Sequence, residues 1–208
     1  MYYEQYSRFS GWGAWSSPMK SAEQLNIEEK LQKVPQGGVV ADIGSGFGLS
    51  LTSYVFSSRP DLSVVSIDPA YVERRTFDPT KTADLYEDPC RQLLLKGNHK
   101  WLKKMVSAYC EELPIASESV DLAVSYAVVP NHVFNPVKAL NEIVRTLKPS
   151  GELTFGPFSD DLYEDFETTL REVVALPSVQ DWSIRSDEMT DAYGDQIDVY
   201  FADLTKAA

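Results

Sequence analysis

Residues 39–50 decide the fold, and they read Val39-Val40-Ala41-Asp42-Ile43-Gly44-Ser45-Gly46-Phe47-Gly48-Leu49-Ser50. The first five are apolar apart from Asp42, and such a short apolar run predicts a buried β-strand. Glycines at alternate positions then predict a tight turn in which a ligand can lie against bare backbone. A helix is expected to follow through about Ser57, and its first amide groups would offer donors to that ligand. The stretch therefore predicts a strand, a glycine turn and a helix, with a carboxylate just before the turn.

Short apolar runs and helical stretches continue to alternate as far as about residue 158. Further strands are predicted at 62–68, 120–125 and 152–156, and an amphipathic helix at 136–147, which Pro149 and Gly151 stop. Strands that alternate with helices indicate parallel βαβ units in a doubly wound α/β sheet. In such a sheet a ligand binds beyond the carboxyl ends of the strands, where the strand order reverses.

The alternation ends after residue 158. A helix predicted at 160–176 precedes two strand-like runs near 182–186 and 196–204. The connection between these runs is too short for a helical crossover, so we expect them to form an antiparallel pair. The fold class predicted from the pattern is therefore α/β, with a mostly parallel sheet and an antiparallel C-terminal pair.

The first 15 residues are rich in aromatic side chains, which are Tyr2, Tyr3, Tyr6, Phe9, Trp12 and Trp15. The spacing of Tyr2, Tyr6 and Phe9 predicts one face of a short helix, and a second helix is predicted at about 18–34. Two interpretations stay open. The aromatics either pack on the body of the protein or form a lid, in which Tyr6, Trp12 and Trp15 contact the substrate. We divide the chain into a helical N-terminal lid, 1–36, and an α/β domain, 37–208.

Composition places this 208-residue chain among ordinary globular proteins. It is 43% hydrophobic and 24% charged, and its length favours one domain with appendages. Two cysteines and two histidines are too few for a disulfide framework or a tetrahedral zinc site, so no metal centre is predicted. The sequence has no signal-peptide pattern and no run of 18 apolar residues. We therefore expect a cytoplasmic protein with no membrane partner.

Charge is unevenly distributed along the chain. The formal net charge is −12, and residues 159–208 contain 13 acidic side chains against Arg171, Arg185 and Lys206. This balance repels polyanions, so no nucleic-acid partner is predicted. One basic stretch, 71–104, has eight Lys or Arg side chains against five acidic ones. It is interpreted either as a solvated helical face or as a docking site for an acidic substrate.

Four segments carry a resemblance to a known family, in the order in which that family has them. They are the glycine motif, Asp68 at the end of the 62–68 run, the segment 109–121, and the helix with its exit at 139–153. Together they resemble the class I S-adenosylmethionine-dependent methyltransferases, in the branch that acts on small molecules. The resemblance implies a Rossmann-like sheet of seven strands. It also implies an extended insertion at 71–108, between strands two and three, because this chain is longer there than the family commonly is.

The resemblance assigns cofactor-binding roles to named positions. The amino-acid end of S-adenosylmethionine would lie against the glycine motif, at Asp42, Gly44, Ser45, Gly46 and Gly48. Asp68, followed by Pro69, would bind the ribose hydroxyls, since one carboxylate can accept hydrogen bonds from both. The adenine side would be formed by Cys110 and Glu111, and a wall of the pocket by Ser125 and Tyr126.

Some of these positions have an alternative role, and one position departs from the family's pattern. An alternative for Asp42 is a buried acceptor for turn amides, and one for Asp68 is a turn or capping aspartate before Pro69. Many relatives place an aspartate where Tyr109 stands and use it on the adenine amino group. His132 is the one candidate for a catalytic base, although a structural histidine bonded to backbone fits the same position.

The expected activity is methyl transfer from S-adenosylmethionine to a small-molecule acceptor, with S-adenosylhomocysteine as the product. Transfer from a sulfonium is an in-line displacement that depends chiefly on alignment of the reactants. The alternative is a non-catalytic relative that binds either molecule and acts as a partner or regulator. A nicotinamide-dependent oxidoreductase is disfavoured, because Leu49 stands where the dinucleotide fingerprint needs glycine.

Overall fold

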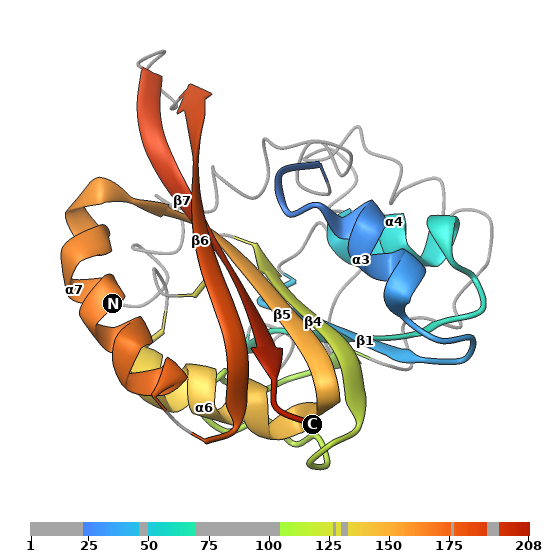
Figure 1. The fold of residues 1–208 in the computed structure, drawn as a ribbon. Coiled ribbons are helices and arrows are strands. Elements are labelled where there is room, and N and C mark those ends of the chain that lie inside the picture. The colour runs from blue at the N-terminus through green and yellow to red at the C-terminus, as the bar shows by residue number, and fades with distance from the viewer. Residues whose placement is uncertain are drawn as a thin grey trace.

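A computed structural model of the chain describes residues 23–45, 50–69, 105–126, 128–129, 133–175, 177–190 and 196–208. Within these residues the backbone forms a single mixed sheet with helices on both faces (Figure 1). The aromatic N-terminal segment and most of the 71–108 insertion lie outside the described residues.

The sheet has seven strands in the described part of the chain, in the order β3-β2-β1-β4-β5-β7-β6. Their bounds are β1 Val39–Ile43, β2 Ser63–Ile67, β3 Met105–Val106, β4 Val120–Tyr126, β5 Leu147–Ser159, β6 Val179–Thr190 and β7 Gln196–Lys206. The first five strands pair in parallel, whereas β7 runs antiparallel to both β5 and β6. The predicted α/β sheet with an antiparallel C-terminal pair is confirmed.

Helices cover the two faces of the sheet as in a doubly wound fold. One face carries α3, Ile27–Lys33, and α4, Ser50–Ser58; the other carries α6, Pro136–Thr146, and α7, Asp160–Val174 (Figure 1). Chain order is reversed on the two sides of β1, because β2 and β3 lie to one side and β4 and β5 to the other. The strand order therefore switches between β1 and β4, and ligands of such sheets bind at this point.

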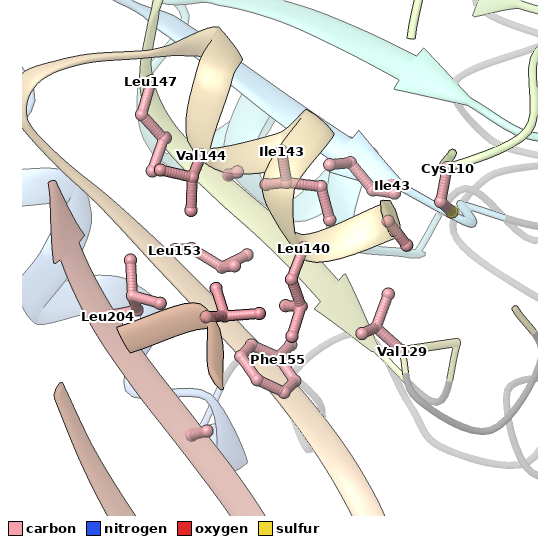
Figure 2. Close-up of a cluster of buried hydrophobic side chains, with 14 of the residues drawn as sticks. Ile43, Cys110, Val129, Leu140, Ile143, Val144, Leu147, Leu153, Phe155 and Leu204 are labelled. Carbon is pink, nitrogen blue, oxygen red and sulfur yellow. The ribbon is translucent and has the colours of Figure 1, made fainter. Parts of the chain in front are cut away.

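The larger core lies between the sheet and α6 with α7. Asn135 caps α6 by accepting a hydrogen bond from the Lys138 amide at 2.9 Å, and Pro136 suits the first turn. Apolar residues on one face of α6, including Leu140, Ile143 and Val144, then point toward β5 (Figure 2). A second core packs α3 and α4 on the opposite face. Burial on both faces holds the strand ends in fixed positions.

Two predicted elements differ from the observed ones. The helix predicted at 18–34 is interrupted within the described residues: residues 23–24 are helical, a turn follows at 25–26, and α3 begins at Ile27. Asn26 has φ 51°, a left-handed conformation that a right-handed helix cannot include. The strand predicted at 152–156 extends over Leu147–Ser159, because residues from Leu147 onward already pair with β4 across an irregularity. None of the described helices is long and apolar enough to cross a membrane.

Candidate functional site

The glycine turn begins directly at the end of β1. The amides of Gly44 and Ser45 both donate to the Ile67 carbonyl, at 2.7 and 3.1 Å, so the turn is fastened to the end of β2. Gly44 has φ +70°, and a Cβ atom there would lie 2.1 Å from Cγ2 of Val128. The turn is therefore packed tightly against the segment that follows β4, and only glycine satisfies both constraints.

Asp42 lies in β1, two residues before Gly44, and its carboxylate is buried, with 2% of the residue's surface exposed. Its Oδ2 accepts two hydrogen bonds from Thr52 of α4, from the amide at 3.0 Å and from Oγ1 at 2.6 Å. Burial raises the pKa of Asp42 to about 6, and the charge of Asp68 adds to the rise, while the bonds from Thr52 oppose it. Asp42 is therefore a buried hydrogen-bond acceptor, as the alternative interpretation expected, but its donor is Thr52 of α4 and not the amides of the glycine turn.

Asp68 follows β2 and is completely buried. Its amide donates to the Val106 carbonyl at 3.1 Å, which fixes the backbone at the edge where β2 and β3 end. The next residue, Pro69, accepts a hydrogen bond from Oγ of Ser107 at 3.2 Å. The charge of Asp68 acts on both Asp42 and Cys110, so these three side chains share one electrostatic environment at the carboxyl edge of the sheet.

Cys110 and Glu111 form the next part of this edge. Burial raises the pKa of the Cys110 thiol to about 12, with further contributions from Glu111 and Asp68. Oε1 of Glu111 accepts hydrogen bonds from the amides of Phe134 and Asn135, at 2.6 and 3.1 Å. The Glu111 side chain therefore fixes the backbone that enters α6, a structural role that the sequence analysis did not assign to it.

Two exposed aromatic side chains lie at this rim. Tyr109 is 56% exposed and Phe134 is 65% exposed, and they are the exposed large hydrophobic side chains of the described chain. Their ring centroids are 6.0 Å apart with an interplanar angle of 61°, an edge-to-face contact. Sequence analysis singled out Tyr109 but missed Phe134, for which the signal was an aromatic residue placed directly before a helix cap.

The end of β4 contributes Ser125 and Tyr126. Oγ of Ser125 is buried and has no hydrogen-bond partner among the described residues. The Tyr126 hydroxyl donates to Oε1 of Gln24 at 2.7 Å, and the Gln24 carbonyl accepts a hydrogen bond from Arg185 of β6. The backbone that precedes α3 is thereby tied to the site, a link that sequence reasoning missed because its members are far apart in the chain.

The remaining predicted site residues lie outside the described residues, namely Gly46, Gly48, His132, Tyr6, Trp12 and Trp15. Within the described ranges no group of three or more His, Cys, Asp or Glu side chains has the arrangement of a metal site. The structure thus brings together Asp42, Gly44, Asp68 and Cys110 at one edge of the sheet.

Comparison with known proteins identifies the family. The sequence profile described as "Methyltransferase domain" matches residues 41–155, which is more than half of the chain and includes the whole carboxyl edge described above. The chain belongs to this methyltransferase family. A search of curated protein sequences finds no match.

Several solved structures share the fold of this methyltransferase. N-methyltransferase NodS from Bradyrhizobium japonicum, in complex with S-adenosyl-L-homocysteine, is 14% identical, with 100% of this chain and 99% of NodS covered and a TM-score of 0.63. A SAM-dependent methyltransferase from Methanosarcina mazei is 15% identical over 88% of this chain and 97% of its own, with a TM-score of 0.58. YcgJ from Bacillus subtilis is 13% identical over 89% and 99%, with a TM-score of 0.56.

S-adenosylmethionine is therefore the cofactor of this methyltransferase, on a Rossmann-like sheet. The chemistry of the edge suits this cofactor, which carries an ammonium group, a sulfonium and two vicinal hydroxyls. Buried carboxylates lie at the ends of β1 and β2, and a carboxylate can accept hydrogen bonds from an ammonium group or from hydroxyls. The backbone of the glycine turn offers a surface without side chains.

Proposed function

We propose that this methyltransferase transfers the methyl group of S-adenosylmethionine to a small-molecule acceptor. The observation that carries the proposal is the pair of buried carboxylates, Asp42 and Asp68, at the carboxyl edge of a methyltransferase sheet. Carboxylates at these two strand ends can accept hydrogen bonds from the ammonium group and the ribose hydroxyls of the cofactor. The acidic balance of the chain, −12, disfavours a nucleic-acid acceptor.

The binding roles follow the order of the strands. Asp42, with the turn at Gly44 and Ser45 and the glycines at 46 and 48, would hold the amino-acid end of the cofactor. Asp68 would accept both ribose hydroxyls, and Pro69 would border the ribose. Backbone groups of Cys110 and Glu111 would meet the adenine. The carboxylate that relatives use at position 109 is replaced by the Tyr109–Phe134 aromatic pair, which can pack against a planar base.

Catalysis would rest on alignment of the acceptor with the methyl group. The bound cofactor supplies an activated methyl group, and holding the acceptor in line with it can contribute roughly 7–11 kcal/mol. Cys110 does not act as a nucleophile near neutral pH, because a thiol with a pKa of about 12 is protonated. An acceptor that must lose a proton needs a base, and His132 remains the residue we propose for that role.

The acceptor would be enclosed by the N-terminal segment. We propose that Tyr6, Trp12 and Trp15 belong to a lid that excludes water, with the insertion at 71–108 on the opposite rim. The anchoring of Gln24 to Tyr126 supports this proposal, since the chain then leaves α3 toward the N-terminus beside the end of β4.

The test is an isotope-transfer assay with the full chain. S-adenosylmethionine with a labelled methyl group is incubated with the protein and with panels of amines, phenols, thiols and carboxylic acids, and labelled products are identified by mass spectrometry. The amine panel comes first because NodS is named an N-methyltransferase. We expect label in one small-molecule class and an equal amount of S-adenosylhomocysteine.

The matched control is Asp68→Ala, which should weaken cofactor binding by about 1.5–3 kcal/mol, the range for hydrogen bonds to a charged group. Transfer of label only to RNA, DNA or protein would contradict the small-molecule proposal. Cofactor binding with no transfer to any acceptor would favour a binding partner or regulator instead.

A further inference from the structure

Thr52 has an unusual set of contacts for a residue in the first turn of a helix. It is buried, and its amide and its hydroxyl both reach the same oxygen of Asp42, Oδ2. The same hydroxyl lies 2.7 Å from Oγ of Ser66, the residue of β2 that is the register partner of Asp42. One threonine therefore connects α4, β1 and β2 at the carboxyl edge.

The hydrogen atoms in this network have only one consistent arrangement when Asp42 is ionised. A carboxylate can only accept, so the single hydroxyl hydrogen of Thr52 must be donated to Oδ2. The Thr52 oxygen must then accept from the Ser66 hydroxyl. Ser66 thus donates to Thr52, and Thr52 donates to Asp42, which makes the bond to the carboxylate directional and charge-assisted.

The two oxygens of Asp42 consequently differ. Oδ2 receives both donors from Thr52, whereas no hydrogen bond to Oδ1 from a described residue is found. The neighbours of Asp42 within the sheet, Ser66 and Val124, offer Oδ1 no charged partner. Oδ1 is therefore the oxygen that a ligand can use.

We propose that Thr52 is a positioning residue for the cofactor: it commits Oδ2 of Asp42 to the protein and keeps the carboxylate ionised, with Oδ1 left for the ammonium group. The inference rests on the proposed role of Asp42 at the amino-acid end of S-adenosylmethionine. Thr52 itself need not touch the cofactor, because it acts through the carboxylate.

The surroundings of Asp42 at the carboxyl edge of the sheet oppose its ionisation, and the Thr52 hydroxyl counteracts this effect. Asp42 is buried beside Asp68, and both burial and that like charge favour its protonated form. Among the described residues, Asp68 is the ionisable side chain that acts on Asp42 from a neighbouring strand end, and α4 supplies only the two Thr52 donors. A protonated Asp42 would lose its attraction for an ammonium group, so the Thr52 hydroxyl should preserve affinity as the pH falls.

The experiment compares wild type with Thr52→Val, Thr52→Ser and Ser66→Ala by calorimetric titration with S-adenosylhomocysteine, from about pH 6 to about pH 8.5. Valine keeps the shape and the amide but removes the hydroxyl. If the lost bond raises the pKa of Asp42 by about one unit, the ratio of dissociation constants, Thr52→Val over wild type, is about fivefold at pH 6 and near one above about pH 8. Taking the ratio cancels the titration of the ligand itself.

Two variants separate positioning from packing. Thr52→Ser restores the hydroxyl and should return the wild-type pH profile. Ser66→Ala removes a buried hydroxyl from the same network but leaves both donors on Asp42, so its ratio should stay near one throughout. Circular dichroism of each variant establishes that it is folded at every pH used.

The inference is overturned if the Thr52→Val ratio does not change with pH, or if Ser66→Ala gives the same profile as Thr52→Val. Failure of the proposed function would look different, because wild type itself would then show no binding of S-adenosylhomocysteine at any pH.

Discussion

Replacing Gly44 by alanine tests the packing of the glycine turn. The substitution adds one methyl group at a residue with φ +70°, where the three nearest atoms all belong to Val128, at 2.1, 2.7 and 2.8 Å. The left-handed conformation alone costs a non-glycine residue about 1–2 kcal/mol. Overpacking a tight site adds about 1–3 kcal/mol. The expected loss in the free energy of unfolding for Gly44→Ala is therefore about 2–5 kcal/mol.

Gly37 provides the matched control. It has φ +76°, close to that of Gly44, but a Cβ atom there would have no atom within 4 Å. Gly37→Ala should therefore cost only the conformational part, about 1–2 kcal/mol. The difference between the two variants isolates the steric contact between the glycine turn and the segment after β4.

Urea unfolding followed by far-ultraviolet circular dichroism measures both variants, and calorimetry with S-adenosylhomocysteine reports on the site. A double variant with Val128→Ala should recover part of the loss at Gly44, because it removes the Cγ atoms but not Cβ of Val128. Equal losses for Gly37→Ala and Gly44→Ala, with no recovery in the double variant, would refute the close contact.

Three other predictions concern the site and its surroundings. The pKa of Asp42 in the folded protein is about 6, above its ordinary value of 3.8, so ionisation of Asp42 destabilises the fold as the pH rises through about 6. The Asp42→Asn variant should therefore be more stable than wild type by about 3 kcal/mol at pH 8 and by little below pH 4, as measured by urea unfolding at each pH. Tyr109→Asp restores an acceptor for the adenine amino group and should increase the preference for S-adenosylhomocysteine over its 6-oxo analogue about tenfold in competition binding; an unchanged preference would mean that position 109 does not meet the base. Deleting residues 1–15 should abolish turnover and leave a folded core that binds cofactor; normal turnover would contradict the lid, and failure to fold would mean that the aromatics are core.

Local patterns in the sequence predicted most of the sheet. The run at 39–43 predicted β1 with its observed bounds, because a strand buried on both faces reads as a continuous apolar run. The helix at 136–147 was predicted almost to the residue, since Pro136 and the exit through Pro149 mark its two ends. The positions of Asp42 and Asp68 at neighbouring strand ends follow from parallel pairing alone.

Contacts between distant parts of the chain could not be predicted in this way. Tyr126 and Gln24 are 102 residues apart, and Arg185 lies 161 residues from Gln24, so no periodicity relates them. The pairing of Glu111 with the backbone at 134–135 depends on where two loops meet after the strands have paired. The role of Thr52 was missed because a threonine in the first turn of a helix looks like an ordinary residue until its partners are known.

The position of β7 has a consequence for the order of folding. This strand follows β5 and β6 in the chain but lies between them in the sheet. Pairing of β6 with β7 closes only the connection at 191–195, whereas pairing of β5 with β7 brings together residues as far apart as Glu152 and Thr205. Loop-closure entropy favours the shorter connection, so the β6–β7 hairpin should assemble first and then dock on β5 as one ribbon. Until that docking occurs, the edge of β5 stays open, and at high protein concentration the hairpin of a second molecule can fill it and form an exchanged dimer during refolding.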